Sequence, residues 1–149
     1  MPERASSSVV NDVLVHLNRS LLQYAGESWP WSDSEAAGER AVIESLVARQ
    51  QTHVARIVDL LLERYAGIDF GVYPTEYTDL HYVALDYLLT LLVAGEQDVL
   101  ADIDRALPLC EGDEAAARIL EDARADQREI VEQLQRLAST RTSMAGSVL

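Results

Sequence analysis

Apolar residues recur at steps of three and four along nearly the whole chain. This spacing places them on one face of an α-helix, whereas a strand would need alternation every second residue. No competing strand pattern occurs, so the sequence predicts an all-α protein. The first such face can be read from six residues: Val10, Val13, Leu14, Leu17, Leu21 and Tyr24.

Capping residues and helix breakers divide this pattern into four predicted helices. Ser6 to Ser8 can cap the first helix, Thr78 or Asp79 the third, and Gly26 and Gly67 end the first and second. The predicted helices cover residues 8–26, about 35–65, about 79–107 and about 114–138. Residues 1–138 then form one domain, and 139–149 form a flexible tail because they offer little to bury.

The links between the predicted helices differ in length. Residues 27–34 and 108–113 are short links, which make the joined helices antiparallel neighbours. Residues 68–79 form a longer, aromatic-rich link that can carry the chain back along the other helices. We therefore predict a four-helix bundle with a crossover segment between its second and third helices.

Composition narrows the class of protein. The chain has 149 residues, 48% of them hydrophobic, which suits one domain with a sizeable core. Its net charge of −13 disfavours binding to nucleic acid or to an anionic membrane. The single cysteine, Cys110, excludes an internal disulfide and is read as a small buried apolar residue. No signal peptide or membrane span is recognised, so we expect a cytoplasmic protein.

Two polar residues, Gln50 and His53, interrupt the apolar pattern of the second predicted helix, and Gln50 lies on the apolar stripe itself. Polar groups on a buried face cost free energy unless they find partners. A Glu-x-x-His step in such a place is how ferritin-like bundles hold iron, and here the carboxylate is replaced by Gln50. Over about residues 8–138, the chain resembles the ferritin-like superfamily of the rubrerythrin and bacterioferritin type.

That resemblance implies where a metal centre would lie. The family takes one Glu from each of helices one and three, and a Glu-x-x-His pair from each of helices two and four. Tyr24 falls where the first Glu would be, and Glu96 is the sole charge on the apolar row of helix three. Helix four offers either Asp126 with Glu129 or Gln127 with Ile130, and we favour the second register because Gln127 lies on the apolar stripe.

The candidate metal residues are therefore His53, Glu96, Gln50 and Asp126. One histidine and one carboxylate are too few for two iron ions, so we expect a vestigial or empty site and no cofactor. A single divalent ion such as zinc, on His53, Glu96 and Asp126, is the alternative. Without metal, we expect Gln50, His53 and Glu96 to converge in a hydrogen-bonded cluster. His16 and His81 do not complete a ligand set.

For function, the sequence contains no phosphate loop, nucleophile elbow or other enzyme signature. We expect a bundle protein without a working di-iron centre that acts through protein contacts and is not an enzyme. The third predicted helix is apolar on more faces than one bundle covers, so we expect a homodimer. The alternative is a metal-binding oxidoreductase or metal-handling protein with a reduced ligand set.

Overall fold

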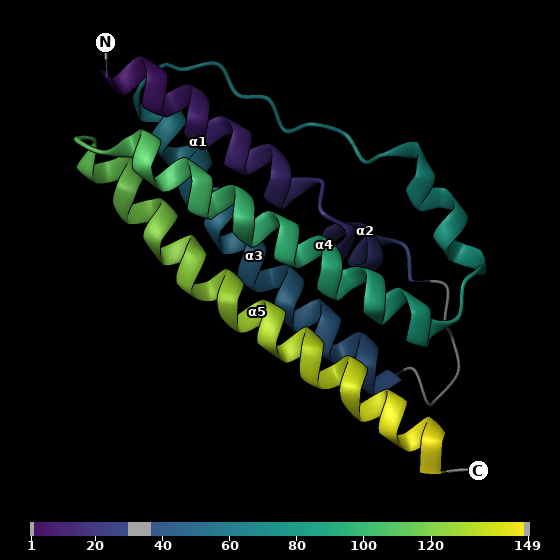
Figure 1. The fold of residues 1–149 in the computed structure, drawn as a ribbon. Helices are drawn as coiled ribbons and strands as arrows, with labels where there is room; N and C mark the ends of the chain where they lie inside the picture. Colours follow the sequence, from purple (N-terminus) through teal and green to yellow (C-terminus); the bar gives the residue numbers. More distant parts are fainter. Residues whose placement is uncertain (1, 30–36, 148–149) are drawn as a thin grey trace.

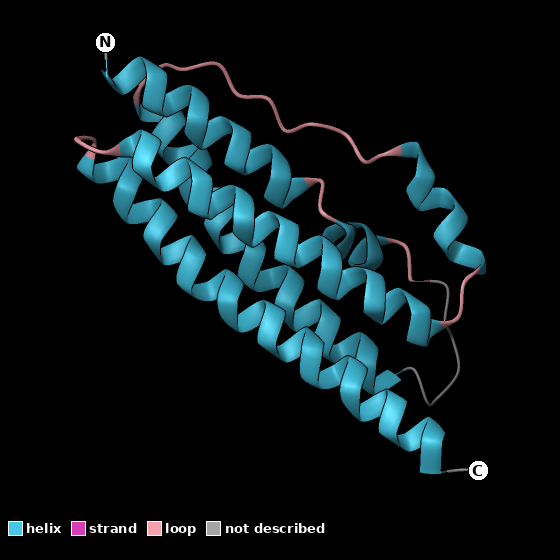
Figure 2. Ribbon diagram, in the orientation of Figure 1, coloured by secondary structure: helices cyan, strands magenta, loops and turns pink. Residues whose placement is uncertain are grey.

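The computed structural model describes residues 2–29 and 37–147, and every regular element among them is a helix (Figure 2). The all-α prediction is confirmed. The α-helices are α1 (Pro2–Asn18), α2 (Leu21–Glu27), α3 (Ala37–Glu63), α4 (Leu85–Ala106) and α5 (Glu114–Ser147). Two 3-10 helices, η2 (Thr75–Tyr82) and η3 (Leu107–Cys110), precede and follow α4.

The long helices α1, α3, α4 and α5 lie side by side, with α1 and α5 running one way and α3 and α4 the other (Figure 1). Both α1 and α5 pack against α3 and α4. After α3 the chain runs back along α1 before it enters η2 (Figure 1). Two hydrogen bonds hold this segment to α1: Asn18 Nδ2 donates to the Phe70 carbonyl over 3.1 Å, and the Asp69 N–H donates to Asn11 Oδ1 over 3.0 Å.

The first predicted helix is in fact two helices. The chain leaves the helical conformation at Ser20, whose backbone is extended (φ −64°, ψ 156°). The Ser20 side-chain oxygen caps α2 by accepting a hydrogen bond from the Gln23 N–H. At the other end, α1 starts at Pro2 and so includes the serines that we expected to cap it. Ser6 and Ser7 are buried inside α1 instead.

Other predicted boundaries also shift. Helix α4 begins at Leu85, because residues 75–82 form η2, which contains His81. Helix α5 continues through Ser147, so residues 139–147, expected to be a flexible tail, are helical. An ion pair supports this extension, since Arg141 contacts Glu39 of α3 over 3.0 Å. The predicted start of the second helix, and most of the loop before it, lie outside the described residues.

The buried apolar side chains form two clusters. The first gathers Leu14, Ile57 and Ile103 with their neighbours, and the second gathers Leu46, Leu89 and Leu134 with theirs. Cys110 is fully buried in the first cluster, as predicted, and burial raises the pKa of its thiol. Within residues 2–29 and 37–147, no helix combines the length and apolar character needed to cross a bilayer.

Candidate functional site: a buried polar layer

A layer of buried polar side chains separates the two apolar clusters. On α3 the first cluster uses Val54 onward and the second ends at Leu46, with Gln50 between them. The same order recurs on α4, where Glu96 divides the apolar row, and on α5, where Gln127 does so. The layer consists of five side chains, each at most 5% exposed: Ser20, Gln23, Gln50, Glu96 and Gln127.

Gln50 is the centre of this polar layer. Its Oε1 accepts hydrogen bonds from Ser20 Oγ over 3.3 Å and from Gln23 Nε2 over 2.9 Å. Its Nε2 donates to Gln127 Oε1 over 2.9 Å and to Glu96 Oε1. One side chain therefore links α2, α4 and α5 to α3, and all four hydrogen-bonding positions of its amide are used.

The two other glutamines of the polar layer are satisfied as well. Gln23 Nε2 also donates to the Val47 carbonyl over 3.2 Å, and its Oε1 accepts from Gln51 over 2.6 Å. Gln127 Nε2 donates to the Glu96 carbonyl over 3.0 Å and to Glu96 Oε1 over 3.2 Å. Buried polar groups destabilise a core mainly when they lack partners, so these amides are compatible with a stable fold.

Glu96 is the ionisable member of the polar layer and is fully buried. Burial raises the pKa of its carboxyl to about 7, while hydrogen bonds from Gln127 and Gln50, and smaller effects of the Leu22 N–H and Ser20, act to lower it. Its Oε2 makes no hydrogen bond to the described residues. This carboxyl therefore titrates near neutral pH.

His53 does not join Gln50 and Glu96, contrary to our expectation. Its Nε2 lies 2.8 Å from Asp126 Oδ2, and its Nδ1 has no hydrogen-bond partner in the described part of the chain. A step of three residues turns a side chain roughly 60° around the helix axis, which moves His53 off the line of Gln50 and toward the edge of α5.

Arg49 completes this second, outer group. Its guanidinium contacts both Asp126 and Glu129. Although burial raises the pKa of Asp126, hydrogen bonds from Arg49 and His53 hold it below its usual value. The register that we favoured for the fourth helix is confirmed, because Gln127 and Ile130 are buried while Asp126 lies at the edge and Glu129 is exposed. His16 is also peripheral, half-exposed and 3.2 Å from Asp102.

Gln23 was not among the site residues predicted from the sequence. A continuous helix would keep Tyr24 on the apolar face, but the break at Ser20 lets Gln23 face the polar layer. Tyr24 instead packs against Tyr73 and Tyr77, with ring centroids 5.2 and 5.4 Å away. A serine in the middle of an apolar stripe, with a glutamine three residues later, was the only available signal of this change.

The polar layer does not fit a di-iron centre. Such a centre needs four carboxylates and two imidazoles, whereas the layer offers one carboxylate, three neutral amides and a hydroxyl. The amide hydrogens already bind the oxygens that a cation would need. Within the described residues, no three His, Cys, Asp or Glu side chains are arranged to hold a metal ion. Gln50 and Glu96 thus lie in the polar layer, and His53 and Asp126 lie in the outer group.

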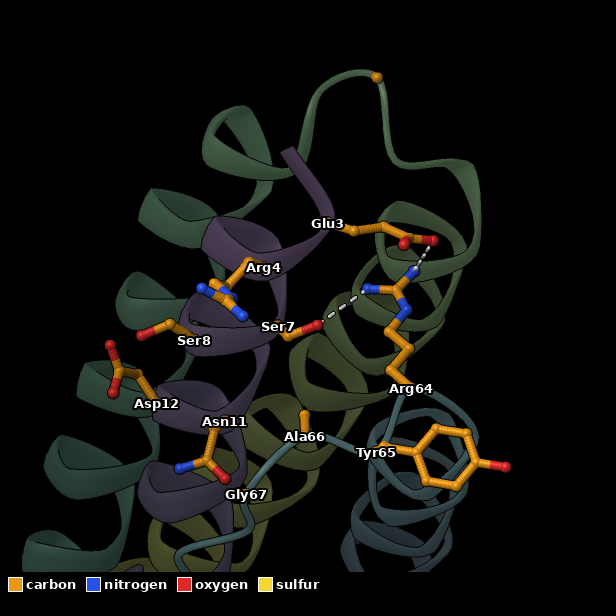
Figure 3. Close-up of a pocket in the computed structure, with 11 residues that line it drawn as sticks. Glu3, Arg4, Ser7, Ser8, Asn11, Asp12, Arg64, Tyr65, Ala66 and Gly67 are labelled. Atoms are coloured by element: carbon orange, nitrogen blue, oxygen red, sulfur yellow. Dashed lines mark hydrogen bonds and ion pairs between the residues drawn. The ribbon is translucent and has the colours of Figure 1, made fainter. Parts of the chain in front are cut away.

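A surface hollow of about 1010 Å³ lies at the end of the molecule where α1 begins and α3 ends (Figure 3). Arg64 points into it and contacts Ser7 over 3.2 Å and Glu3 over 4.0 Å. The same guanidinium binds both oxygens of Asp113 over 2.7 and 2.9 Å. Through these contacts, Arg64 ties the start of α1, the end of α3 and the residue before α5 together.

Comparison with known proteins finds no protein-family model and no curated protein that matches this chain.

Proposed function

We propose that this protein is a ferritin-like four-helix bundle in which a hydrogen-bonded amide layer takes the place of the di-iron centre. The long helices α1 with α2, α3, α4 and α5 would form the bundle, and residues 64–84 its crossover. The observation that carries the proposal is the position of Gln50 and Glu96 at mid-helix, in direct contact, where the family holds its metal. Gln50 makes four hydrogen bonds there without any ion.

We propose further that the protein acts in the cytoplasm through protein contacts and not through redox chemistry, with a second copy of itself as partner. Exposed apolar side chains support a role in protein contacts, because a partner that covers them removes apolar surface from water. Phe70 is 46% exposed and Val72 81% exposed, and both lie on the segment after α3 that runs back along α1. An obligate dimer would bury on the order of 2,000 Å².

Iron loading tests the first part of the proposal. Protein purified without chelator is exposed to Fe(II) in air, and we expect neither stoichiometric iron nor ferroxidase activity. Gln50→Glu serves as a matched variant and should remain inactive, because α5 still supplies no histidine. Two iron atoms per chain with an oxo-bridged absorption band would overturn the proposal.

Light scattering at micromolar concentration tests the second part. We expect the mass of a dimer for the wild type and a monomer for Val72→Asp. Leu109→Asp is the control, because Leu109 is 64% exposed but lies in η3, away from this segment. A wild-type monomer would refute self-association, and a dimer unaffected by Val72→Asp would place the interface elsewhere.

A further inference from the structure

Glu96 is a buried acid without a buried base. Its side chain projects from α4 into the polar layer and is 0% exposed. Oε1 accepts from Gln50 and Gln127, both neutral, and Oε2 has no hydrogen-bond partner among the described residues. A carboxylate in such surroundings is poorly solvated, so the neutral acid is favoured.

Among the described residues, the main groups that act on the Glu96 carboxyl include no cation. It faces Ser20 and the Leu22 N–H on the α2 side, Gln50 on α3 and Gln127 on α5. The titratable neighbour is Tyr77 of η2, whose pKa is raised by burial and further by Glu96. The basic side chains of α3 nearest in sequence to Gln50 are Arg49 and His53, and both contact Asp126. Arg19, between α1 and α2, is exposed and acts on Tyr77.

Helix α2 is the shortest of the α-helices that surround the polar layer. It has seven residues, too few for a helix to be stable in isolation. Ser20 and Gln23 attach its beginning to Gln50, and Gln23 also bonds to the Val47 carbonyl. Water could therefore reach Glu96 most easily by displacement of α2.

We propose that Glu96 is an internal proton-binding site that controls the docking of α2: the neutral acid keeps the polar layer closed, and loss of its proton loosens α2. The inference goes beyond the proposed function and does not depend on kinship with ferritin-like proteins. Because the pKa of the Glu96 carboxyl is about 7, a modest rise in pH above neutral removes its proton and leaves a negative charge in the polar layer. Trp29, which follows α2 and packs against the second apolar cluster, would change environment at the same time.

Hydrogen exchange of the intact protein, followed by mass spectrometry, tests this proposal. Protection of residues 21–27 is compared at pH 5.5 and pH 8 after correction for intrinsic exchange rates. We expect protection in the wild type to fall on the order of tenfold or more at pH 8. A raised pKa of Glu96 in the closed state makes that state less stable relative to the open state as pH rises. Glu96→Gln should keep high protection at both pH values, while Glu121→Gln, an exposed control on α5, should behave like the wild type.

A second measurement requires no variant. Carbon-13 NMR of labelled glutamate carboxyls in the wild type should reveal one group titrating near pH 7, with the same midpoint in EDTA and in zinc. The proposal would be overturned if every glutamate carboxyl titrated near its ordinary pKa. It would also be overturned if the hydrogen-exchange protection of α2 did not change with pH. A midpoint that shifts with zinc would also overturn it, because Glu96 would then be a metal ligand.

Discussion

At the scale of single residues, two buried carboxyls link stability to pH in opposite directions. Glu96 has a raised pKa because the interior favours its neutral form. Asp113 has a lowered pKa because Arg64 binds its charged form. Loss of the Glu96 proton therefore lowers the free energy of unfolding as pH rises, and protonation of Asp113 lowers it as pH falls.

The free energy of unfolding should fall between about pH 4.5 and pH 7 because of Glu96. The folded-state pKa of about 7 exceeds the ordinary value of 4.5, so the stabilisation is complete below the ordinary value and lost as pH rises through 7. The shift corresponds to about 3 kcal/mol at most. Glu96→Gln should flatten this dependence in urea titrations and raise stability at pH 8. A variant as pH-dependent as the wild type would contradict this assignment.

Asp113→Ala should destabilise the protein at neutral pH by about 3 kcal/mol, since it leaves Arg64 largely buried without its partner. It also removes the acceptor for the Ala116 N–H at the start of α5. Because the pKa of Asp113 is lowered, the wild-type advantage should begin to decline below about pH 4 and should be lost only as the pH falls through that lowered pKa. Thermal unfolding at pH 7 and pH 3 measures both effects. Asp122→Ala is the control, because its pair with Arg56 is exposed.

At the scale of elements, the position of α2 depends on the contact that Gly26 makes with α3. A Cβ atom built on Gly26 would lie 2.7 Å from Val47 Cγ2. Valine has a branched, stiff side chain, so it cannot move aside cheaply. The close approach of α2 to α3 therefore requires glycine at this position.

Two helical glycines should respond to alanine with opposite signs. Gly26→Ala should cost about 1–3 kcal/mol through the clash with Val47. Gly38→Ala, in the first turn of α3 with nothing within 4 Å of its added Cβ, should stabilise by about 0.5–1 kcal/mol. Chemical denaturation provides both values. Val47→Ala should relieve the cost of Gly26→Ala, and additive effects of the two substitutions would rule out the contact.

At the scale of the whole molecule, the polar layer divides the core but its hydrogen bonds join the helices around it. The two apolar clusters are therefore expected to unfold together, not as separate units. Leu14 represents the first cluster and Leu89 the second, and both are 0% exposed.

Leu14→Ala and Leu89→Ala should each lower the free energy of unfolding by about 2–5 kcal/mol. Because the clusters are coupled, both variants should still unfold in a single transition. Far-UV circular dichroism and tryptophan fluorescence, followed in parallel during urea denaturation, should then coincide. Leu109→Ala should have little effect, since Leu109 is 64% exposed. Separate transitions for the two probes would show that the layer insulates the clusters.

Much of the helical structure could be read from the sequence because it depends on local spacing. The apolar rows around Gln50, Glu96 and Gln127 correctly predicted that these polar residues are buried. The interior position of Gln127, with Asp126 at the edge, followed from the same periodicity. Periodicity does not report where a helix bends, so the break at Ser20 and the inward turn of Gln23 were missed.

The all-α class, and the inward-facing residues of the unbroken helices α3, α4 and α5, follow from the 3.6-residue period of the sequence. Only the tertiary structure decided which of those residues meet. The pairing of His53 with Asp126, and of Gln50 with Glu96, depends on how neighbouring helices are rotated against one another. The ion pair between Arg141 of α5 and Glu39 of α3 likewise joins residues far apart in the chain. Such contacts carry no local periodic signal, since each is created only when the helices pack.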